Sequence, residues 1–330
     1  MFARPRAPQV TLHVLTGLAL LAASNSAAAQ SLEEPTPLQA PAPGERQRSS
    51  ETPSASAPAD RRPTTRRLEW RWNRFNVVDY VSTALLSAAY VYVELKAGPV
   101  DPHWTGGILF DDGARDTLVA DSRDGRDKAG TVSDWFTLAP QIHLFADSIV
   151  VPLADRWNLD VAWQMTAINL QAMAITGLLT RGGHHLIARE RPDVSECRDD
   201  SDYDAQCFGG STASFPSGHT SSAFAGAALG CAHHAHLPLY GEGPGGAISC
   251  GVDLALATTS GTLRVISDRH YASDVIMGAA LGTSVGLGLP FLFHYHEPKR
   301  AKEIGAAEFR WTIAPLPHPE APGLSVYGWF

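Results

Sequence analysis

The sequence has 330 residues, which is long enough for one large helical domain with tails at both ends. Its 26 Lys and Arg against 34 Asp and Glu give a formal net charge of −8. This balance argues against a nucleic-acid partner, because phosphate backbones are bound through excess positive charge.

The first 29 residues have the pattern of a secretory signal peptide. Arg4 and Arg6 provide a positive start, residues 10–23 form a short apolar core, and the alanines at 27–29 form a cleavage site. A transmembrane anchor is the alternative, but this apolar run is too short to span a hydrocarbon layer of about 30 Å comfortably. We therefore predict a signal peptide over residues 1–29.

Residues 30–67 are rich in Pro, Ala and Ser and have no apolar periodicity. Such a segment cannot bury enough apolar surface to offset its chain entropy, which predicts a disordered linker. The end of the linker is basic, with six arginines from Arg61 to Arg74 around Trp70 and Trp72. This end could associate with an anionic membrane surface, although a solvated linker end explains the same charges.

Apolar segments predict one mainly helical domain over residues 68–298. The first helix is expected at 76–96, where Gly98 and Pro99 end it. Residues 111–134 are rich in Asp and Gly but lack EF-hand spacing, so we expect a solvated loop with one short helix. Further helices are expected near 135–154, 159–181, 220–237, 246–266 and 273–296. The expected fold is an all-α helical bundle of about six core helices.

One motif lies between the last two helices, over residues 263–274. His270 and Asp274 are four residues apart, about one helical turn, so we expect Asp274 to reach back to His270 and fix its tautomer. Arg264 offers a planar cation suited to a phosphate-like oxyanion. A surface His–Asp pair would show the same spacing, so this motif alone does not establish catalysis.

Two earlier motifs also lie at helix ends. In residues 214–222, the backbone N–H groups of Ser217 and Gly218 are expected at a helix N-terminus, where an anion is favoured. An ordinary helix N-cap explains the same residues equally well. In residues 184–192, Arg189 and Arg191 precede Pro192, which ends an apolar helix and places two cations beyond it.

Taken in chain order, the three motifs resemble the signature of the type 2 phosphatidic acid phosphatase superfamily, which includes bacterial non-specific acid phosphatases and vanadium haloperoxidases. The family pattern is Lys-x6-Arg-Pro, then Pro-Ser-Gly-His, then Ser-Arg-x5-His-x3-Asp. Residues 191–192 match the first motif, residues 216–219 the second, and Arg264, His270 and Asp274 the third. The resemblance covers roughly residues 75–297.

Two positions depart from the family pattern. His184 stands at the position of the family lysine, and Leu263 replaces the serine before the arginine of the third motif. Histidine is cationic only near or below its usual pKa of about 6.5, whereas lysine is charged throughout that range. The departure at His184 therefore bears on phosphate affinity and pH optimum more than on reaction type.

The resemblance implies an enzyme that hydrolyses phosphate monoesters without a metal or cofactor. His270 would attack phosphorus and form a phosphohistidine, Asp274 would hold the ring, and His219 would protonate the leaving oxygen and later activate water. The substrate oxygens would be bound by Arg191, Arg264, His184 and the backbone of Ser217 and Gly218. The expected substrate is a phosphorylated small molecule or a lipid head group, and the sequence does not choose between them.

Two other functions fit the same motifs. A vanadate-dependent haloperoxidase would use the same pocket, and halide oxidation that needs added vanadate would identify it. A phosphate-binding protein that has lost turnover through the change at His184 is the alternative outside enzymes.

The expected location is periplasmic or secreted, following the signal peptide. Six apolar helices also describe the membrane-spanning branch of the family, with its catalytic face outside. Polar residues such as His143, Asp147 and Asp253 interrupt the helices and are costly at membrane depth, which favours a soluble or peripheral domain. A cleaved signal would also place the first motif, three spans later, on the cytoplasmic side.

The cysteines and the C-terminal tail complete the predictions. In an oxidising compartment Cys197 and Cys207 are expected to close the loop between two motifs. Cys231 and Cys250 could form a second bridge or remain buried thiols. None of the four lies in a C-x-x-C pair, and we expect no metal site. Residues 299–330 alternate apolar and polar residues in two stretches, which predicts a terminal β-hairpin.

Overall fold

The structure is a computed structural model that describes residues 68–296, apart from 97, 99, 156, 205, 206 and 208–210, and the backbone of 310–315 and 324–329. The predicted signal peptide and linker lie outside the described residues.

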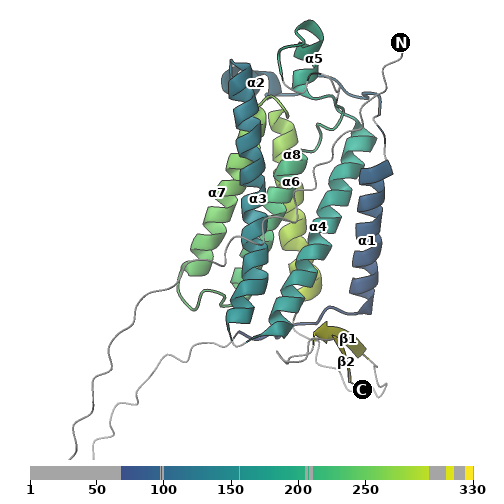
Figure 1. Cartoon of the computed structure of the whole chain (residues 1–330), viewed down its shortest axis with the longest axis vertical. Coiled ribbons are helices and arrows are strands. Elements are labelled where there is room, and N and C mark those ends of the chain that lie inside the picture. Colours follow the sequence, from purple (N-terminus) through teal and green to yellow (C-terminus); the bar gives the residue numbers. More distant parts are fainter. Residues whose placement is uncertain are drawn as a thin grey trace, which may run out of the picture. The chain divides into compact units, whose positions relative to one another are not determined.

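Six long α-helices run side by side, and two short ones lie at one end of the bundle (Figure 1). The long helices are α1 (Val77–Lys96), α3 (Arg123–Ala154), α4 (Leu159–Ile187), α6 (Gly218–His236), α7 (Gly245–Ile266) and α8 (Ala272–Leu289). The short ones are α2 (Asp111–Leu118) and α5 (Pro192–Asp199), and α8 continues into a π-helical turn, η1 (Pro290–His294). The predicted all-α class is confirmed by these eight α-helices of the described residues.

Two short strands follow the helical bundle in the chain. β1 (Arg310–Pro315) pairs antiparallel with β2 (Leu324–Trp329), with Arg310 opposite Trp329. Residues 316–323, which connect the strands, lie outside the described residues. The predicted terminal hairpin as a whole therefore stays a prediction.

The prediction for residues 111–134, a solvated loop with one short helix, is confirmed for the short helix and wrong for residues 123–134. α2 covers its first part, and α3 begins at Arg123, about three turns before the apolar run that starts at Trp135. Ser122 caps α3 by accepting a hydrogen bond from the N–H of Gly125, and the buried Arg126 donates to the carbonyls of Ala120, Asp121 and Tyr203. Local composition favours a loop here, but these caps and tertiary contacts stabilise a helix.

α6 is the central helix and packs against α3, α4, α7 and α8. Its approach to α8 depends on three glycines spaced four residues apart on α8, Gly278, Gly282 and Gly286. A Cβ at these positions would lie 2.7, 2.2 and 2.7 Å from backbone oxygens at the start and middle of α6. This close packing fixes the start of α6 beside the start of α8, where two of the three motifs lie.

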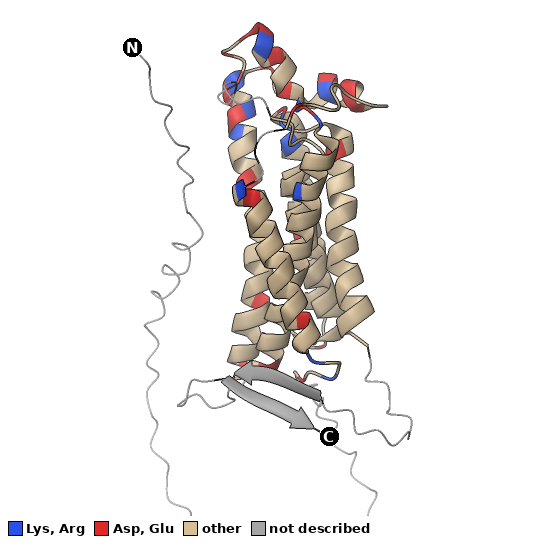
Figure 2. Ribbon diagram, turned by 90° about the vertical axis from the view of Figure 1, so that its right-hand side faces the viewer, with Lys and Arg blue, Asp and Glu red and all other residues tan. Residues whose placement is uncertain are grey.

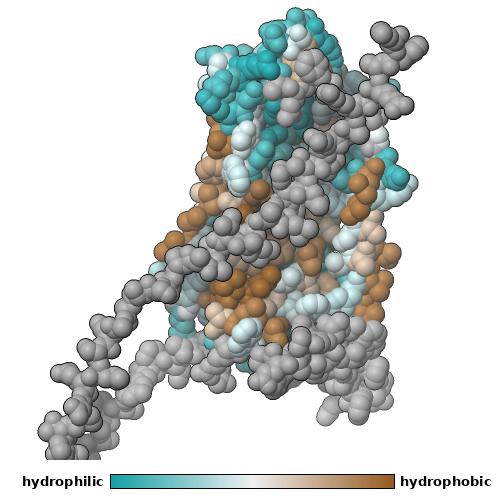
Figure 3. Space-filling model, in the orientation of Figure 1, coloured by the Kyte–Doolittle hydropathy of each residue, from teal (hydrophilic) through white to brown (hydrophobic). Residues whose placement is uncertain are grey.

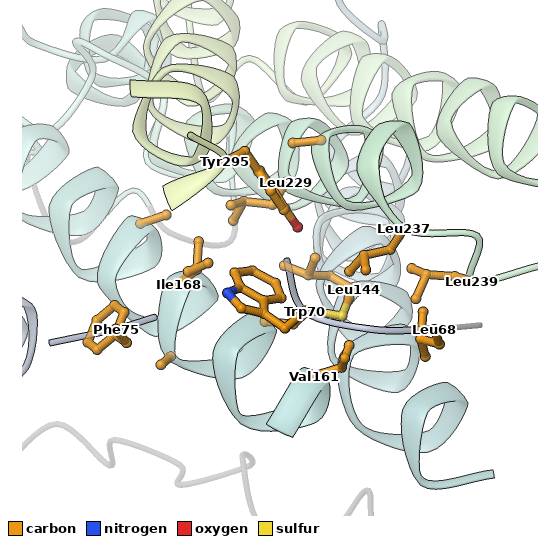
Figure 4. Packing of buried hydrophobic residues seen from close by; sticks show 14 residues of the cluster. Leu68, Trp70, Phe75, Leu144, Val161, Ile168, Leu229, Leu237, Leu239 and Tyr295 are labelled. Atoms are coloured by element: carbon orange, nitrogen blue, oxygen red, sulfur yellow. The ribbon is translucent and has the colours of Figure 1, made fainter. Parts of the chain in front are cut away.

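A cluster of buried apolar side chains joins the start of α4 to the ends of α3, α6 and α8 (Figure 4). Trp70, Phe75 and Tyr295 are its aromatic members, and residues 68–75 cross this end of the bundle before α1 begins. Each large side chain buried here contributes about 1.5–3 kcal/mol to stability. The cluster therefore holds the bundle together at the end opposite the motifs.

The polar residues that interrupt the apolar helices pair with one another inside the bundle. His143 on α3 contacts Asp253 on α7 at 2.8 Å, and Asp147 on α3 accepts hydrogen bonds from His234 at 2.9 Å and Tyr240 at 2.5 Å. Buried polar groups cost little once they are satisfied in this way. Among the described residues no group of three or more His, Cys, Asp or Glu could hold a metal ion.

The surface of the helical bundle carries many exposed apolar side chains. They include Val78, Leu85 and Tyr92 on α1, and Trp135 and Ile142 on α3. Figure 3 shows hydrophobic surface over the body of the bundle and hydrophilic surface at the motif-bearing end. By length and composition, two helical segments of the described part could cross a membrane, Arg123–Ala154 and Ala272–His294.

Two disulfides are present. Cys197–Cys207 closes the loop between two motifs, as predicted, and Cys231–Cys250 joins α6 to α7, so the open alternative of buried thiols does not apply to this pair. A disulfide-bonded chain is typical of a non-reducing environment, which indicates a membrane or extracytoplasmic location.

Candidate active site

The three motifs lie together at the polar end of the helical bundle. Charged residues gather at this end, whereas the middle of the bundle carries few of them (Figure 2). The first motif lies at the end of α4, the second at the start of α6, and the third at the turn between α7 and α8. The structure brings these helix ends together at one end of the bundle.

Arg191 is the N-cap residue of α5, and Pro192 occupies the first helical position, where its missing N–H costs nothing. α4 ends at Ala188 in the left-handed conformation, with φ of 45°, and this turn directs the chain toward Arg191. The Nε atom of Arg191 is buried, and within the described part of the chain it has no hydrogen-bond partner. Arg191 is thus a cation held in the site without a fixed partner at Nε.

His270 presents one free ring nitrogen to the site. Nδ1 lies 2.8 Å from the carbonyl oxygen of Ser214, and because a carbonyl can only accept, Nδ1 carries the proton. Nε2 therefore holds a lone pair, and this buried atom has no partner among the described residues. Burial, reinforced by Arg191 and Arg264, holds the pKa of His270 well below its usual value, so the imidazole is neutral.

The predicted hydrogen bond between Asp274 and His270 is wrong. Asp274 Oδ2 is 3.9 Å from Nδ1 of His270, and that nitrogen donates to Ser214 instead. The spacing of four residues suggested one helical turn, but α8 begins only at Ala272, so His270 precedes the helix. Asp274 is the N3 residue of α8, and its carboxylate accepts from the N–H of Tyr271 as part of a capping box.

At the start of α6, Ser217 and Gly218 play different parts. The N–H of Ser217 donates to the carbonyl oxygen of Asp274 at 3.0 Å, so the prediction that it binds substrate does not fit this structure. Gly218 is the first residue of α6, where N–H groups have no partner within the helix and the helix dipole favours an anion. The backbone of Gly218 and His219 can therefore bind oxygen, whereas Ser217 positions the turn.

His184 does not fit the predicted role of a cation on substrate. Its side chain is only 8% exposed, and Nε2 donates to the carbonyl oxygen of Pro216 at 2.9 Å, behind the turn that begins α6. Burial lowers the pKa of His184 to about 4. The ring is therefore neutral at physiological pH, whereas the family lysine would be charged. His184 stabilises the turn at Pro216 through this hydrogen bond.

Asp134 is a site residue that the motifs did not indicate. Its Oδ1 lies 3.0 Å from Nε2 of His219 and 3.3 Å from a guanidinium nitrogen of Arg264. The carboxylate thus joins the second motif to the third from the neighbouring helix α3. Only its position as the last acidic residue before the apolar run of α3 could have drawn attention to it.

Neither of the two arginines nearest to His184 in sequence takes the place of the family lysine in this site. Arg189, five residues after His184, is fully buried and bonded to Asp111 and Asp274. Arg181 lies at the end of α4 and pairs with Glu94 of α1. The site therefore offers an unpaired histidine nitrogen, the guanidinium groups of Arg191 and Arg264, and His219 with Asp134.

Comparison with known proteins agrees with this arrangement. Residues 166–299 match the model of the PAP2 superfamily. The chain is 30% identical over 162 residues to a lipid A 1-phosphatase of Porphyromonas gingivalis, a match that covers 46% of this chain and 31% of that protein. The chain thus matches about a third of the length of this curated relative.

A solved structure is also similar, that of a transmembrane PAP2 type phosphatidylglycerolphosphate phosphatase from Bacillus subtilis. It is 18% identical with a TM-score of 0.42, and the match covers 66% of this chain and 94% of that one. The superfamily match, by contrast, includes all three motifs and the helices that carry them. Over residues 166–299, this chain is therefore similar to the PAP2 superfamily.

Proposed function

We propose that this protein is a lipid phosphate phosphatase that hydrolyses a phosphate monoester through a phosphohistidine at His270. The observation that supports this most directly is the buried, unpaired Nε2 of His270. Arg191, Arg264 and His219 lie close enough to that imidazole to affect its charge. A neutral nitrogen nucleophile beside two guanidinium groups is the arrangement that attack on a phosphate dianion requires.

In the first step the lone pair of His270 Nε2 attacks phosphorus, and the bond from phosphorus to the ester oxygen breaks. His219 donates its proton to that leaving oxygen as a general acid. Asp134, 3.0 Å from Nε2 of His219, accepts from this nitrogen and favours the protonated ring. The products of this step are a free alcohol and a phosphohistidine with its Nδ1 proton still directed at Ser214.

In the second step water attacks the phosphohistidine, and the bond from phosphorus to nitrogen breaks. His219, now neutral, accepts a proton from that water as a general base. Arg191, Arg264 and the N–H groups at the start of α6 would stabilise the charge on the equatorial oxygens in both steps. These residues come from the start of α5, the start of α6, the end of α7 and the turn before α8. The two steps together return the site to its starting state.

The apolar surface of the helical bundle supports a lipid substrate. A cavity of about 190 Å³ lies between the ends of α1 and α4, and its lining is mixed, with Val93 and Val100 beside polar residues that include Glu94, Arg181 and His184. It is distinct from the space around His270, but His184 borders the cavity and holds the Pro216 turn. The lipid A 1-phosphatase relative is named for a lipid substrate, which agrees with this choice.

We further propose that the bundle spans a membrane. The membrane-spanning segments would be residues 77–93, 135–154, 159–180, 221–236, 245–263 and 276–294, whose exposed side chains are mostly apolar. The polar groups within them, such as Asp147 with His234, pair inside the bundle, which removes the main objection to a membrane location. The Cys197–Cys207 disulfide lies at the motif-bearing end, so this end would face the oxidising side. Because α1 ends at the motif-bearing end, its start would then lie on the cytoplasmic side, so this proposal is an alternative to the cleaved signal peptide predicted for residues 1–29.

The test compares two phosphomonoesters with the same head group on the full-length protein in detergent. We expect phosphate release from phosphatidate in mixed micelles with kcat/KM at least about tenfold above that for glycerol 3-phosphate. His270→Ala should release no phosphate from either. Preference for glycerol 3-phosphate would remove the lipid assignment, and absence of hydrolysis of both esters and of a lipid pyrophosphate would remove the phosphatase assignment.

Location is tested separately. We expect the protein to remain with membranes after an alkaline carbonate wash and to enter solution only with detergent. Release by carbonate alone would show a peripheral protein and contradict the membrane-spanning proposal.

A further inference from the structure

The nucleophilic ring of His270 is oriented by a backbone carbonyl. Its Nδ1 donates to the carbonyl oxygen of Ser214 at 2.8 Å. A carbonyl holds the ring and its tautomer but brings no full negative charge. The position of Ser214 therefore decides the direction in which Nε2 points.

Ser214 is fully buried and held from two sides. Its hydroxyl donates to Oδ2 of Asp274 at 2.6 Å, and its N–H donates to the carbonyl oxygen of Arg189 at 3.1 Å. The same Oδ2 accepts from the N–H of Tyr271, the residue after His270, at 2.9 Å. Asp274 thus joins the two chain segments that meet at the imidazole, without contacting the ring itself.

Arg189 completes the arrangement from the other side of Asp274. It is fully buried, and Nη1 donates to Oδ1 of Asp274 at 2.5 Å and to Ser273 at 2.8 Å. Nη2 donates to Asp111 at 2.8 Å and to the carbonyl of Gly106 at 2.9 Å, and Nε donates to the same carbonyl. All five N–H donors of the guanidinium are therefore used.

Two aromatic rings fix the plane of this guanidinium. Its carbon lies 4.0 Å from the ring centres of both Trp104 and Tyr271. Such stacking stabilises a cation, and more so in a desolvated site than at an exposed one. With all its donors used and both faces covered, Arg189 cannot also contact a substrate.

We infer that Arg189 and Asp274 are positioning residues that orient His270 through Ser214. In this arrangement Arg189 neutralises the Asp274 carboxylate, which lies 3.9 Å from the imidazole, so the ring faces a balanced ion pair. This inference rests on the proposed function, since it assigns how that nucleophile is held. It replaces the direct His–Asp contact that the spacing of the motif suggests.

The first test is a double-mutant cycle with Ser214→Ala and Asp274→Asn on full-length protein. Ser214→Ala removes the hydroxyl but keeps the carbonyl and N–H, so kcat should fall while KM stays within about twofold. Because both changes break the same link, the double variant should lose little more than the worse single one. Losses that multiply would show that Asp274 acts on His270 without Ser214 and would overturn the inference.

The second test removes the charge of Arg189. Burial raises the pKa of Asp274 to about 6 even beside Arg189, so Asp274 and His270 take up a proton as a coupled pair. Arg189→Met removes the cation that opposes this uptake, so the pKa of the pair should rise by about one unit or more. The acid limb of kcat/KM, which reports the pair without this proton, should shift upward by the same amount. The other charged groups around the ring, Arg191, Arg264 and His219, are unchanged in this variant.

Two controls separate positioning from general loss of structure. Arg189→Lys keeps the charge and should leave the acid limb near its wild-type position, and Arg189→Met with Asp274→Asn should restore it. An acid limb that does not move in Arg189→Met would overturn the charge-balancing role. If Arg189→Met does not fold, the Ser214 cycle alone decides the positioning role.

A measurement that does not need catalytic turnover keeps the Arg189 test independent of the proposed function. An NMR titration of the His270 ring gives its pKa in each variant even if no ester is hydrolysed. Absence of hydrolysis by wild-type protein would count against the function, whereas an unshifted titration in Arg189→Met counts against the inference.

Discussion

Gly282→Ala should destabilise the protein, because it places a methyl group against the backbone of the central helix. The added Cβ would lie 2.2 Å from the carbonyl oxygen of Ser221 and 2.8 Å from the backbone N of Ala225. Ordinary contacts begin near 3.4 Å, so α8 and α6 must separate by about 1 Å to relieve the closer of these two contacts. Neither contacting atom can rotate away, since both belong to the α6 backbone.

The expected magnitude follows from two opposing effects. Overpacking costs about 1–3 kcal/mol, and replacing a helical glycine by alanine returns up to about 1 kcal/mol. A net loss of about 1–2 kcal/mol corresponds to a fall in melting temperature of roughly 2–8 °C for a domain of this size. Since α6 and α8 carry His219 and Asp274 at their starts, kcat should fall as well.

Gly288→Ala is the matched control on the same helix. A Cβ at Gly288 would have nothing within 4 Å, so only the helix-propensity effect remains, and the melting temperature should stay level or rise slightly. The assay is thermal unfolding of the two variants and wild type, followed by circular dichroism in one detergent. A Gly282→Ala protein as stable as wild type, or an equal change in both variants, would refute the packing argument.

Three further predictions concern the site. His270→Ala should reduce turnover by a factor of about a thousand or more while the circular dichroism spectrum stays unchanged, and substantial residual turnover would exclude it as nucleophile. Burial lowers the pKa of His219 and Asp134 partly offsets this, so in Asp134→Asn the pKa of His219 should fall further. The alkaline limb of kcat, which reports protonated His219, should then move to lower pH, and an unmoved limb would separate Asp134 from the acid–base chemistry. His184→Gln keeps an N–H for the carbonyl of Pro216, so its melting temperature should stay near that of wild type. His184→Ala leaves that carbonyl unpaired and should lose about 1–3 kcal/mol of stability. Equal melting temperatures of the two variants would mean that this hydrogen bond contributes nothing.

The sequence by itself determined the fold class, the family resemblance and the place of the motifs at helix ends. Long apolar segments separated by Gly and Pro predict helices from local composition, and the observed α1, α4, α6 and α7 begin within two residues of the predicted positions. The resemblance of the three motifs to a known family singled out His270, His219, Arg191 and Arg264 as candidate site residues.

Tertiary structure alone decided which of these side chains touch each other. The prediction that Asp274 bonds His270 came from helical spacing, and it failed because the helix begins after His270, which leaves Ser214, 56 residues away in the chain, as the partner. His184 could be read as a cation from its position, but burial makes it neutral.

The contacts of Asp134 and Arg189 also could not be predicted from the sequence. Each forms ion pairs or hydrogen bonds with residues 78–130 positions away in the chain, so no local sequence pattern reveals these contacts. Helix propensity and motif spacing are local properties that a sequence displays directly. Ion pairing and desolvation depend on which helices become neighbours. Here the close approach of α8 to α6 at its glycines and the ion pairs of the buried Arg189 exist only in the packed bundle.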